Sequence, residues 1–495
     1  MAWGALAALL WLAATLPFLG RPLLQDADEL AYARVALAAA VQGRWWPLSD
    51  GDRPFYEKPP LQVWLAAATV WADGRPRDAW PYRLWPCLGA ALGLGALAGL
   101  GALLEAPWAG LGAAALLALQ GDWLFHARFF SFDAAFVGLA LAAIGAGLWA
   151  LPGPRRRWWL AGGLLALAVW VKSWMVLALG PAWVWALWRG SGTDEARAAW
   201  PRLAAPALAA LVVWIALYVG WNGWGFLREE WTVNLFGRAL GRTNVNDPQG
   251  NLAFYLKWAQ RSSPALLPLV LGLPLGLWPV GPGPGRWRFA QAYAWACCVS
   301  WALGLAVVKA QTINYSLPLE AGLCLGLALL LAETPRRAGA WALAVLLVAC
   351  AGAGLRLWPP ALSLALGLPL GLALAWGRRQ AAPGSRRPAG LALAALLLLL
   401  LPDAVRLETR PLDGSAALVA LLRRHPPRRP GEPLWLIGSA SLAADFYSDY
   451  RVLHPASLPP TRPRQACAVL AGGRWIFYPP LAGAAGTGKG GQDGR

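Results

Sequence analysis

The sequence predicts a mainly α-helical, polytopic membrane protein with a small C-terminal α/β domain outside the membrane. Of its 495 residues, 58% are hydrophobic and only 14% are charged, which is more apolar than an ordinary soluble domain. Apolar runs of about 20 residues, the length that crosses about 30 Å of hydrocarbon, recur along the chain. The segment after residue 402 is more polar and is therefore assigned to a separate domain.

The apolar runs predict about 13 membrane-spanning helices. The first run has no basic segment before it, so we interpret it as a span and not as a cleaved signal peptide. The predicted spans are 4–20, 84–104, 108–120, 134–151, 158–171, 174–188, 203–221, 264–281, 289–308, 316–332, 339–356, 360–376 and 389–402. Two long segments between them, 21–83 and 222–260, are predicted as outer-face loops with surface helices.

The net charge of +18 would suggest a nucleic-acid partner in a soluble chain. Here much of the arginine lies in short loops between apolar runs, as in the cytoplasmic loops of membrane proteins, so no nucleic acid is expected. With the N-terminus in the cytoplasm, Arg155 and Arg378 face the cytoplasm. The segments 21–83, 222–260 and 403–495 then share the opposite side.

This topology predicts that cysteines introduced at positions 50 and 380 are labelled from opposite sides of the membrane. In a background without the six native cysteines, an impermeant maleimide added outside intact cells should modify position 50 and leave position 380 unmodified. Equal labelling of both positions from outside would contradict the topology and the grouping of the candidate residues on one side.

The division of the chain is predicted as a transmembrane domain, 1–402, followed by a periplasmic α/β domain, 403–495. Within the tail, Pro433–Ile437 and Cys467–Leu470 read as strands that end in glycine turn signals. The glycine-rich end, 486–495, is predicted to be disordered. The cysteines lack metal or disulfide spacing and are expected to be small buried side chains; they are Cys87, Cys297, Cys298, Cys324, Cys350 and Cys467.

The most polar stretch of the first hundred residues, 26–64, opens with Asp26, Asp28 and Glu29. Apolar residues then recur three or four positions apart, which predicts an amphipathic helix over 29–42 along the membrane surface; they are Leu30, Ala33, Leu37 and Val41. An aspartate at its start serves as a helix cap, with Glu29 completing a capping box. The alternative is a general base that activates an acceptor group. Composition alone favours the cap.

The pair Glu57–Lys58 follows two aromatic residues and precedes two prolines, which stiffen the backbone. A solvated surface pair would contribute little, whereas a fixed lysine suits a phosphate and the carboxylate suits a cation. Three further lysines, Lys172, Lys257 and Lys309, also fall on the predicted outer side or at its border. This placement is either chance or a convergence of compact ammonium groups on an anion.

Asp133 stands at the mouth of a predicted span, where a carboxylate is costly unless it is paired or functional. Lys172, between two spans, is a candidate for the same reason. His126 is expected to be structural, and Tyr315 is expected to be an interfacial aromatic anchor. The second outer loop offers further polar candidates, namely Asn234, Arg238 and Arg242.

Five motifs occur in a fixed order between residues 10 and 330. They are Asp28-Glu29-x-x-Tyr32-Ala33, Phe55-Tyr56-Glu57-Lys58-Pro59-Pro60, Arg128-Phe129-Phe130-Ser131-Phe132-Asp133, Lys172, and Lys309 with Tyr315-Ser316-Leu317-Pro318. This order resembles the membrane glycosyltransferases of the GT-C fold. The nearest branch is the bacterial aminoarabinose (lipid A) transferases, which are related to the dolichyl-phosphate-mannose protein mannosyltransferases.

The resemblance implies transfer of a sugar, with inversion, from a polyprenyl-phosphate donor such as undecaprenyl phosphate. The acceptor would be a lipid A-like lipid or another envelope molecule at the periplasmic face of a bacterial inner membrane. Asp28 would be the catalytic acid/base and Asp133 a second catalytic carboxylate. The residues implied to bind the donor and its phosphate are Lys58, Tyr32, Lys172, Arg238, Lys309 and Tyr315.

The resemblance also implies that Glu57 contacts a divalent metal ion. The family's metal-binding histidine in the 222–260 loop has no counterpart in this chain, and Asn234 lies nearest to its place. Two alternatives stay open. One is a protein O-mannosyltransferase, and the other is a lipid or sugar transporter or flippase, although no internal repeat of the transporter type is found.

Overall fold

The computed structural model is mostly helical, as the apolar runs predict. It describes residues 2–20, 23–24, 28–51, 53–190, 193–240, 251–262, 267–277, 285–333, 415–427, 433–437, 451–453, 466–471 and 474–478. Five helical segments in these ranges are long and apolar enough to cross a membrane, namely Trp80–Leu103, Asp133–Ala150, Arg155–Gly190, Asp194–Asn222 and Gly285–Val307. The fold class is confirmed. The total of about 13 spans stays a prediction, because 339–402 lies outside the described ranges.

The first half of the bundle is built on α4 (Trp80–Leu103), which packs against α1 (Ala2–Thr15), α5 (Pro107–Ala118) and α7 (Asp133–Ala150). Small residues bring α4 and α7 close together. A Cβ added at Gly138 would collide with the carbonyl of Gly89 on the facing helix. Such close approach is typical of membrane helices, where dispersion contacts must replace the hydrophobic effect.

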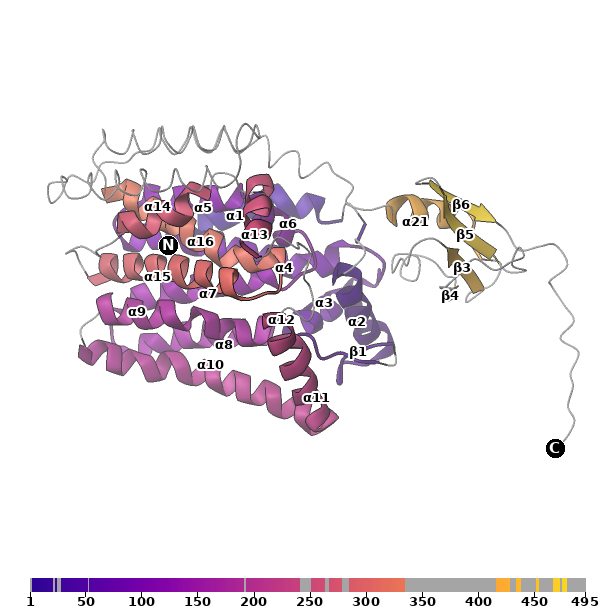
Figure 1. Cartoon of the computed structure of the whole chain (residues 1–495), viewed down its shortest axis with the longest axis horizontal. Coiled ribbons are helices and arrows are strands. Elements are labelled where there is room, and N and C mark those ends of the chain that lie inside the picture. The colour runs from indigo at the N-terminus through magenta and orange to yellow at the C-terminus, as the bar shows by residue number, and fades with distance from the viewer. Residues whose placement is uncertain are drawn as a thin grey trace, which may run out of the picture.

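The second half of the bundle continues from α7. Helix α8 (Trp158–Lys172) packs between α7 and α10 (Thr193–Asn222), while α9 (Gly180–Gly190) packs against α15 (Gly285–Val307). Figure 1 shows these long helices running side by side. The last described helices of the bundle are α14 (Leu267–Leu277) and α16 (Leu317–Glu333).

Three predicted boundaries were wrong. Helix α4 begins at Trp80, with Pro81 in its first turn, so Arg83 belongs to the helix and not to the preceding loop. Helix α10 begins at Thr193 and not at the predicted 203, because Asp194 and Glu195 favour a helix N-terminus there. The predicted span 174–188 starts as a 3₁₀ helix, η3 (Ser173–Leu179), because Ser173 leaves the helical conformation with φ of 47°.

The first outer segment contains α2 (Asp28–Gln42), the short strands β1 (Ser49–Asp50) and β2 (Arg53–Pro54), and α3 (Leu61–Asp73). These elements lie at one end of the bundle (Figure 1). The helix predicted over 29–42 is confirmed, and its expected apolar stripe is buried at Leu30 and Ala33 but not at its end. Val41 is 64% exposed, whereas Ala36 and Ala39 are fully buried. Packing against α3 and β1 decides this, since several sides of α2 are covered.

The second outer segment is also helical. It contains α11 (Trp224–Glu229), a π-helical turn η4 (Glu230–Leu235), α12 (Phe236–Ala239) and α13 (Asn251–Ser262). A short 3₁₀ helix, η6 (Ile313–Ser316), leads into α16. Helix α6 (Gly121–Ala127) contacts both η6 and α7, and it therefore joins the two halves of the chain at one end of the bundle.

The described part of the tail contains α21 (Ser415–Arg424) and a four-stranded sheet of order β4-β3-β5-β6. Strand β3 (Pro433–Ile437) runs parallel to β4 (Arg451–Leu453) and to β5 (Ala466–Ala471). Strand β6 (Arg474–Tyr478) pairs antiparallel with β5. Both strand predictions are confirmed. The domain boundary at 402 and the predicted disordered end, 486–495, lie outside the described residues.

Four cysteines are buried and unpaired with one another, as expected from their apolar surroundings. They are Cys87, Cys297, Cys298 and Cys324. Cys350 lies outside the described residues, and Cys467 lies within strand β5. The described cysteines therefore act as small apolar side chains at helix contacts.

Candidate functional site

Asp133, at the start of α7, forms the centre of a buried polar cluster. Its carboxylate forms a salt bridge with Lys172 at the end of α8, and both side chains are buried. Asn314 of η6 donates its Nδ2–H to Oδ2 of Asp133 at 3.0 Å. A buried ion pair that loses one partner leaves an uncompensated charge, so removing either Asp133 or Lys172 alone would be costly. The structure thus brings together two of the predicted residues.

Tyr315 belongs to the same cluster. The Nζ of Lys172 lies 5.4 Å from the centroid of the Tyr315 ring, within the range of a cation–π contact. The expectation that Tyr315 is only an interfacial anchor is therefore incomplete. Its contact with Lys172 ties η6 to the end of α8.

His126 completes the cluster from α6. Its Nδ1 lies 3.1 Å from Oγ of Ser131 and 3.9 Å from Oδ2 of Asp133. Burial lowers the pKa of the His126 imidazole, and the charges of Asp133, Asp122 and Asp28 oppose this shift. The ring is thus neutral at pH 7, which fits the expected structural role.

A second group of predicted residues meets around Tyr32 of α2. The ring of Tyr32 is buried and packs edge-on against Phe132, with centroids 4.8 Å apart. The Nζ of the half-buried Lys58 lies 5.9 Å from the Tyr32 centroid. Tyr32 therefore links the two motifs that contain Lys58 and Asp133.

Asp28 is the exposed first residue of α2. Tyr32 follows it by one helical turn, so both residues lie on the same face of α2. Asp28 is thus one helical turn from a ring that Lys58 contacts.

Sequence reasoning missed the ion pair that holds Asp28 in place. Glu29 is fully buried, and Arg83 of α4 donates from Nε and Nη2 to its two oxygens at 2.7 and 2.9 Å. The backbone N–H of Phe130 also donates to Glu29, at 2.8 Å. The available signal was Arg83 at the start of an apolar run, where a charged side chain needs an oppositely charged partner. Glu29 therefore joins α2, α4 and the loop before Asp133.

The remaining predicted residues are not brought into these groups. Lys309 lies exposed between α15 and η6, without a recorded contact to the other described candidates. Arg238 lies in α12, and its side chain is outside the described part of the chain. Asp26 and Arg242 also lie outside it.

Asn234, nearest to the place of the family's histidine, binds a buried carboxylate. Its Nδ2 donates to Oε2 of the buried Glu230 at 2.7 Å, and Trp174 donates to Oε1 at 2.9 Å. Glu57 is exposed, and within the described ranges no three His, Cys, Asp or Glu side chains are grouped so that they could hold a metal ion. These residues do not fit the metal site that the resemblance implies, so no step of the chemistry is assigned to a metal here.

No protein-family model matches the chain, and no curated protein matches it by sequence. Among solved structures, it is similar to ArnT from Cupriavidus metallidurans bound to undecaprenyl phosphate. That match has 19% identity and a TM-score of 0.60 over 92% of this chain and 85% of that chain. The apo form of the same protein matches with a TM-score of 0.50 and 19% identity, over 90% and 85% of the two chains. The likeness shows the fold, and the predicted GT-C fold is confirmed.

Proposed function

We propose that this protein is an integral membrane glycosyltransferase that uses a polyprenyl-phosphate sugar as its donor. The acceptor is a lipid A-like lipid or another envelope molecule on the periplasmic side of a bacterial inner membrane. The observation that carries the proposal is the contact of Lys58 with the ring of Tyr32, which lies one helical turn after Asp28 on α2. The fold likeness to ArnT, which was solved with undecaprenyl phosphate, supports this class of donor.

The proposed reaction is a single displacement. Lys58 holds the donor phosphate and offsets the charge that grows on it as the bond from the anomeric carbon to the phosphate oxygen breaks. The acceptor oxygen forms the new bond to the anomeric carbon from the opposite face, and its proton passes to Asp28. The electron pair leaves with the phosphate, which is a good leaving group. The protein therefore needs to position its reactants and needs no covalent intermediate.

The Asp133–Lys172 pair has a supporting place in this proposal. The predicted roles of Asp133 as a second catalytic carboxylate and of Lys172 as a phosphate ligand would require the pair to open, since each side chain now partners the other. In the closed pair, Asp133 orients Asn314, and Lys172 orients Tyr315. Both neighbours belong to η6, which the pair holds against α7 and α8.

Lys58→Ala is expected to weaken the apparent affinity for the donor by about 10- to 100-fold, which corresponds to a charge-assisted hydrogen bond of about 1.5–3 kcal/mol. Stability should change little, because Lys58 is only half-buried. Donor titrations with purified protein measure the affinity, and thermal unfolding in the same detergent measures the stability.

The matched control is Lys257→Ala, which removes the same charge from an exposed position on α13. It should leave donor affinity unchanged. If Lys58→Ala expresses normally and binds the donor as tightly as the parent protein, Lys58 does not bind the phosphate.

A further inference from the structure

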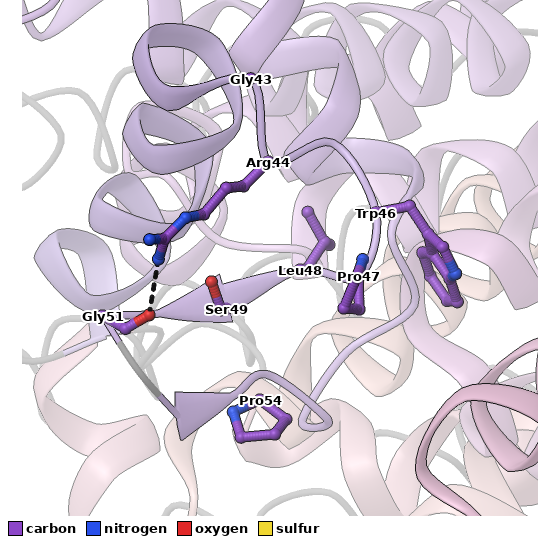
Figure 2. Close-up of a pocket in the computed structure, with 8 residues that line it drawn as sticks. All are labelled: Gly43, Arg44, Trp46, Pro47, Leu48, Ser49, Gly51 and Pro54. Carbon is purple, nitrogen blue, oxygen red and sulfur yellow. Dashed lines mark hydrogen bonds between the residues drawn. The ribbon is translucent and has the colours of Figure 1, made fainter.

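The loop between α2 and β2 surrounds an open cavity of about 430 Å³. Figure 2 shows Arg44 and Gly51 at one end of this cavity and Trp46 at the other, with Ser49 between them. The volume falls within the range of about 300–1,000 Å³ that is usual for small-molecule sites. None of the residues predicted from the sequence lines it.

The charge of the cavity comes from Arg44. Its guanidinium donates one hydrogen bond, from Nη1 to the carbonyl oxygen of Gly51 at 3.2 Å. The nearby carboxylate of Asp50 is already paired with Nε of Arg34 at 3.1 Å, so its charge is offset outside the cavity. A guanidinium has five N–H donors in a planar fork that fits phosphate oxygens. The Arg44 end of the cavity is therefore suited to a phosphate group.

Away from Arg44, part of the lining is apolar. Trp46, Pro47 and Leu48 offer surfaces against which the C–H groups of a sugar or glycerol unit can pack. Beside the cavity, Val41 is 64% exposed and Trp45 is 37% exposed. Exposed tryptophan and aliphatic side chains are typical of a surface at the level of the lipid head groups. These features favour a lipid head group over a freely soluble anion.

The cavity is connected to the Lys58 loop through two aromatic residues. The rings of Trp46 and Tyr218 pack edge-on with centroids 5.0 Å apart. The hydroxyl of Tyr218 donates to the carbonyl oxygen of Lys58 at 3.3 Å. A ligand that contacts Trp46 therefore lies close to the loop that holds the donor phosphate in the proposed function.

We propose that this cavity binds the phosphate-bearing head group of the acceptor lipid, with Arg44 on the phosphate and Trp46 beside the sugar or glycerol unit. The identification of that lipid as the acceptor rests on the proposed function. Recognition of a lipid phosphate by Arg44 does not, and it can be tested separately.

Binding is tested by native mass spectrometry of the full-length protein with dioctanoyl phosphatidic acid. The parent protein and Arg53→Gln, an exposed arginine on β2 that does not line the cavity, should bind it equally. Arg44→Gln should weaken binding by about 10- to 100-fold, as expected for a lost charge-assisted hydrogen bond. Dioctanoylglycerol, which lacks the phosphate, should bind the parent protein as weakly as phosphatidic acid binds Arg44→Gln. Equal binding of phosphatidic acid by all three proteins would overturn the proposal. If inorganic phosphate at the same concentration displaces phosphatidic acid, the site binds free phosphate and not a lipid head group.

Transfer kinetics test the acceptor role. Arg44→Gln should raise the KM for a phosphorylated lipid acceptor by about 10- to 100-fold and leave the KM for the donor unchanged. If the parent protein transfers sugar and Arg44→Gln has an unchanged acceptor KM, the acceptor site is wrong and the proposed function stands. If the parent protein transfers no sugar but still binds phosphatidic acid through Arg44, the proposed function fails and the lipid-phosphate site remains.

Discussion

Arg83→Leu is expected to destabilise the protein by about 3–5 kcal/mol, the usual effect of removing one partner from a buried ion pair. The substitution leaves the fully buried Glu29 without the guanidinium that now donates to both of its oxygens. It also removes the Arg83 hydrogen bonds to the carbonyl oxygens of Leu19 and Leu23. Thermal unfolding in a fixed detergent should show a clearly lower midpoint than the parent protein.

The matched control is the double variant Glu29→Leu/Arg83→Leu, which removes both charges. It should be more stable than Arg83→Leu, because no buried charge is left uncompensated. It should remain less stable than the parent protein, since the N–H of Phe130 loses its acceptor at a cost of about 1–3 kcal/mol. An unchanged midpoint for Arg83→Leu, or a double variant less stable than the single one, would contradict the structural role of the pair.

The helical architecture could be predicted from the sequence because hydropathy is a local property. Each apolar run between 4 and 332 coincides with a described helix, and the errors are at boundaries such as the start of α4 at Trp80. The burial of α2 could not be predicted in the same way. Ala36 and Ala39 are buried by α3 and β1, and alanine is too small to produce a recognisable apolar stripe.

The partners in the candidate site could not be predicted, because they are far apart in the sequence. Asp133 and Lys172 were each identified as costly charges near a membrane, but their pairing depends on how α7 packs against α8. The hydrogen bond of Asn314 could not be predicted at all, because asparagine is common near the end of a membrane span. Glu29 has a local explanation as part of a capping box, and only its contact with Arg83 shows that it anchors the neighbouring Asp28.

Asp28→Asn is expected to reduce turnover by about 100- to 10,000-fold, the usual contribution of a general base. The amide has nearly the same size as the carboxylate but cannot accept a proton from the acceptor at neutral pH. Stability should stay close to that of the parent protein, because Asp28 is exposed and asparagine is also a good residue for a helix start. If Asp28 only caps α2, both turnover and stability should be nearly unchanged.

The internal control is Asp26→Asn, two positions earlier on the same segment. It removes the same charge, and its effect on turnover should be mild if Asp28 is the base. Thermal unfolding of both variants separates a catalytic loss from a folding loss. Large and equal losses of turnover in both variants would show that the charge of the segment matters and that Asp28 has no particular role as a base.

The central claim is tested most directly by sugar transfer from a synthetic polyprenyl-phosphate sugar, with purified protein in detergent and no membrane gradient. The parent protein should form a glycosylated lipid whose anomeric configuration is inverted relative to the donor, and Asp28→Asn should lose this activity while remaining folded. A transporter or flippase would form no product under these conditions. Absence of product with the parent protein, or product formed at the parent rate by Asp28→Asn, would contradict the account.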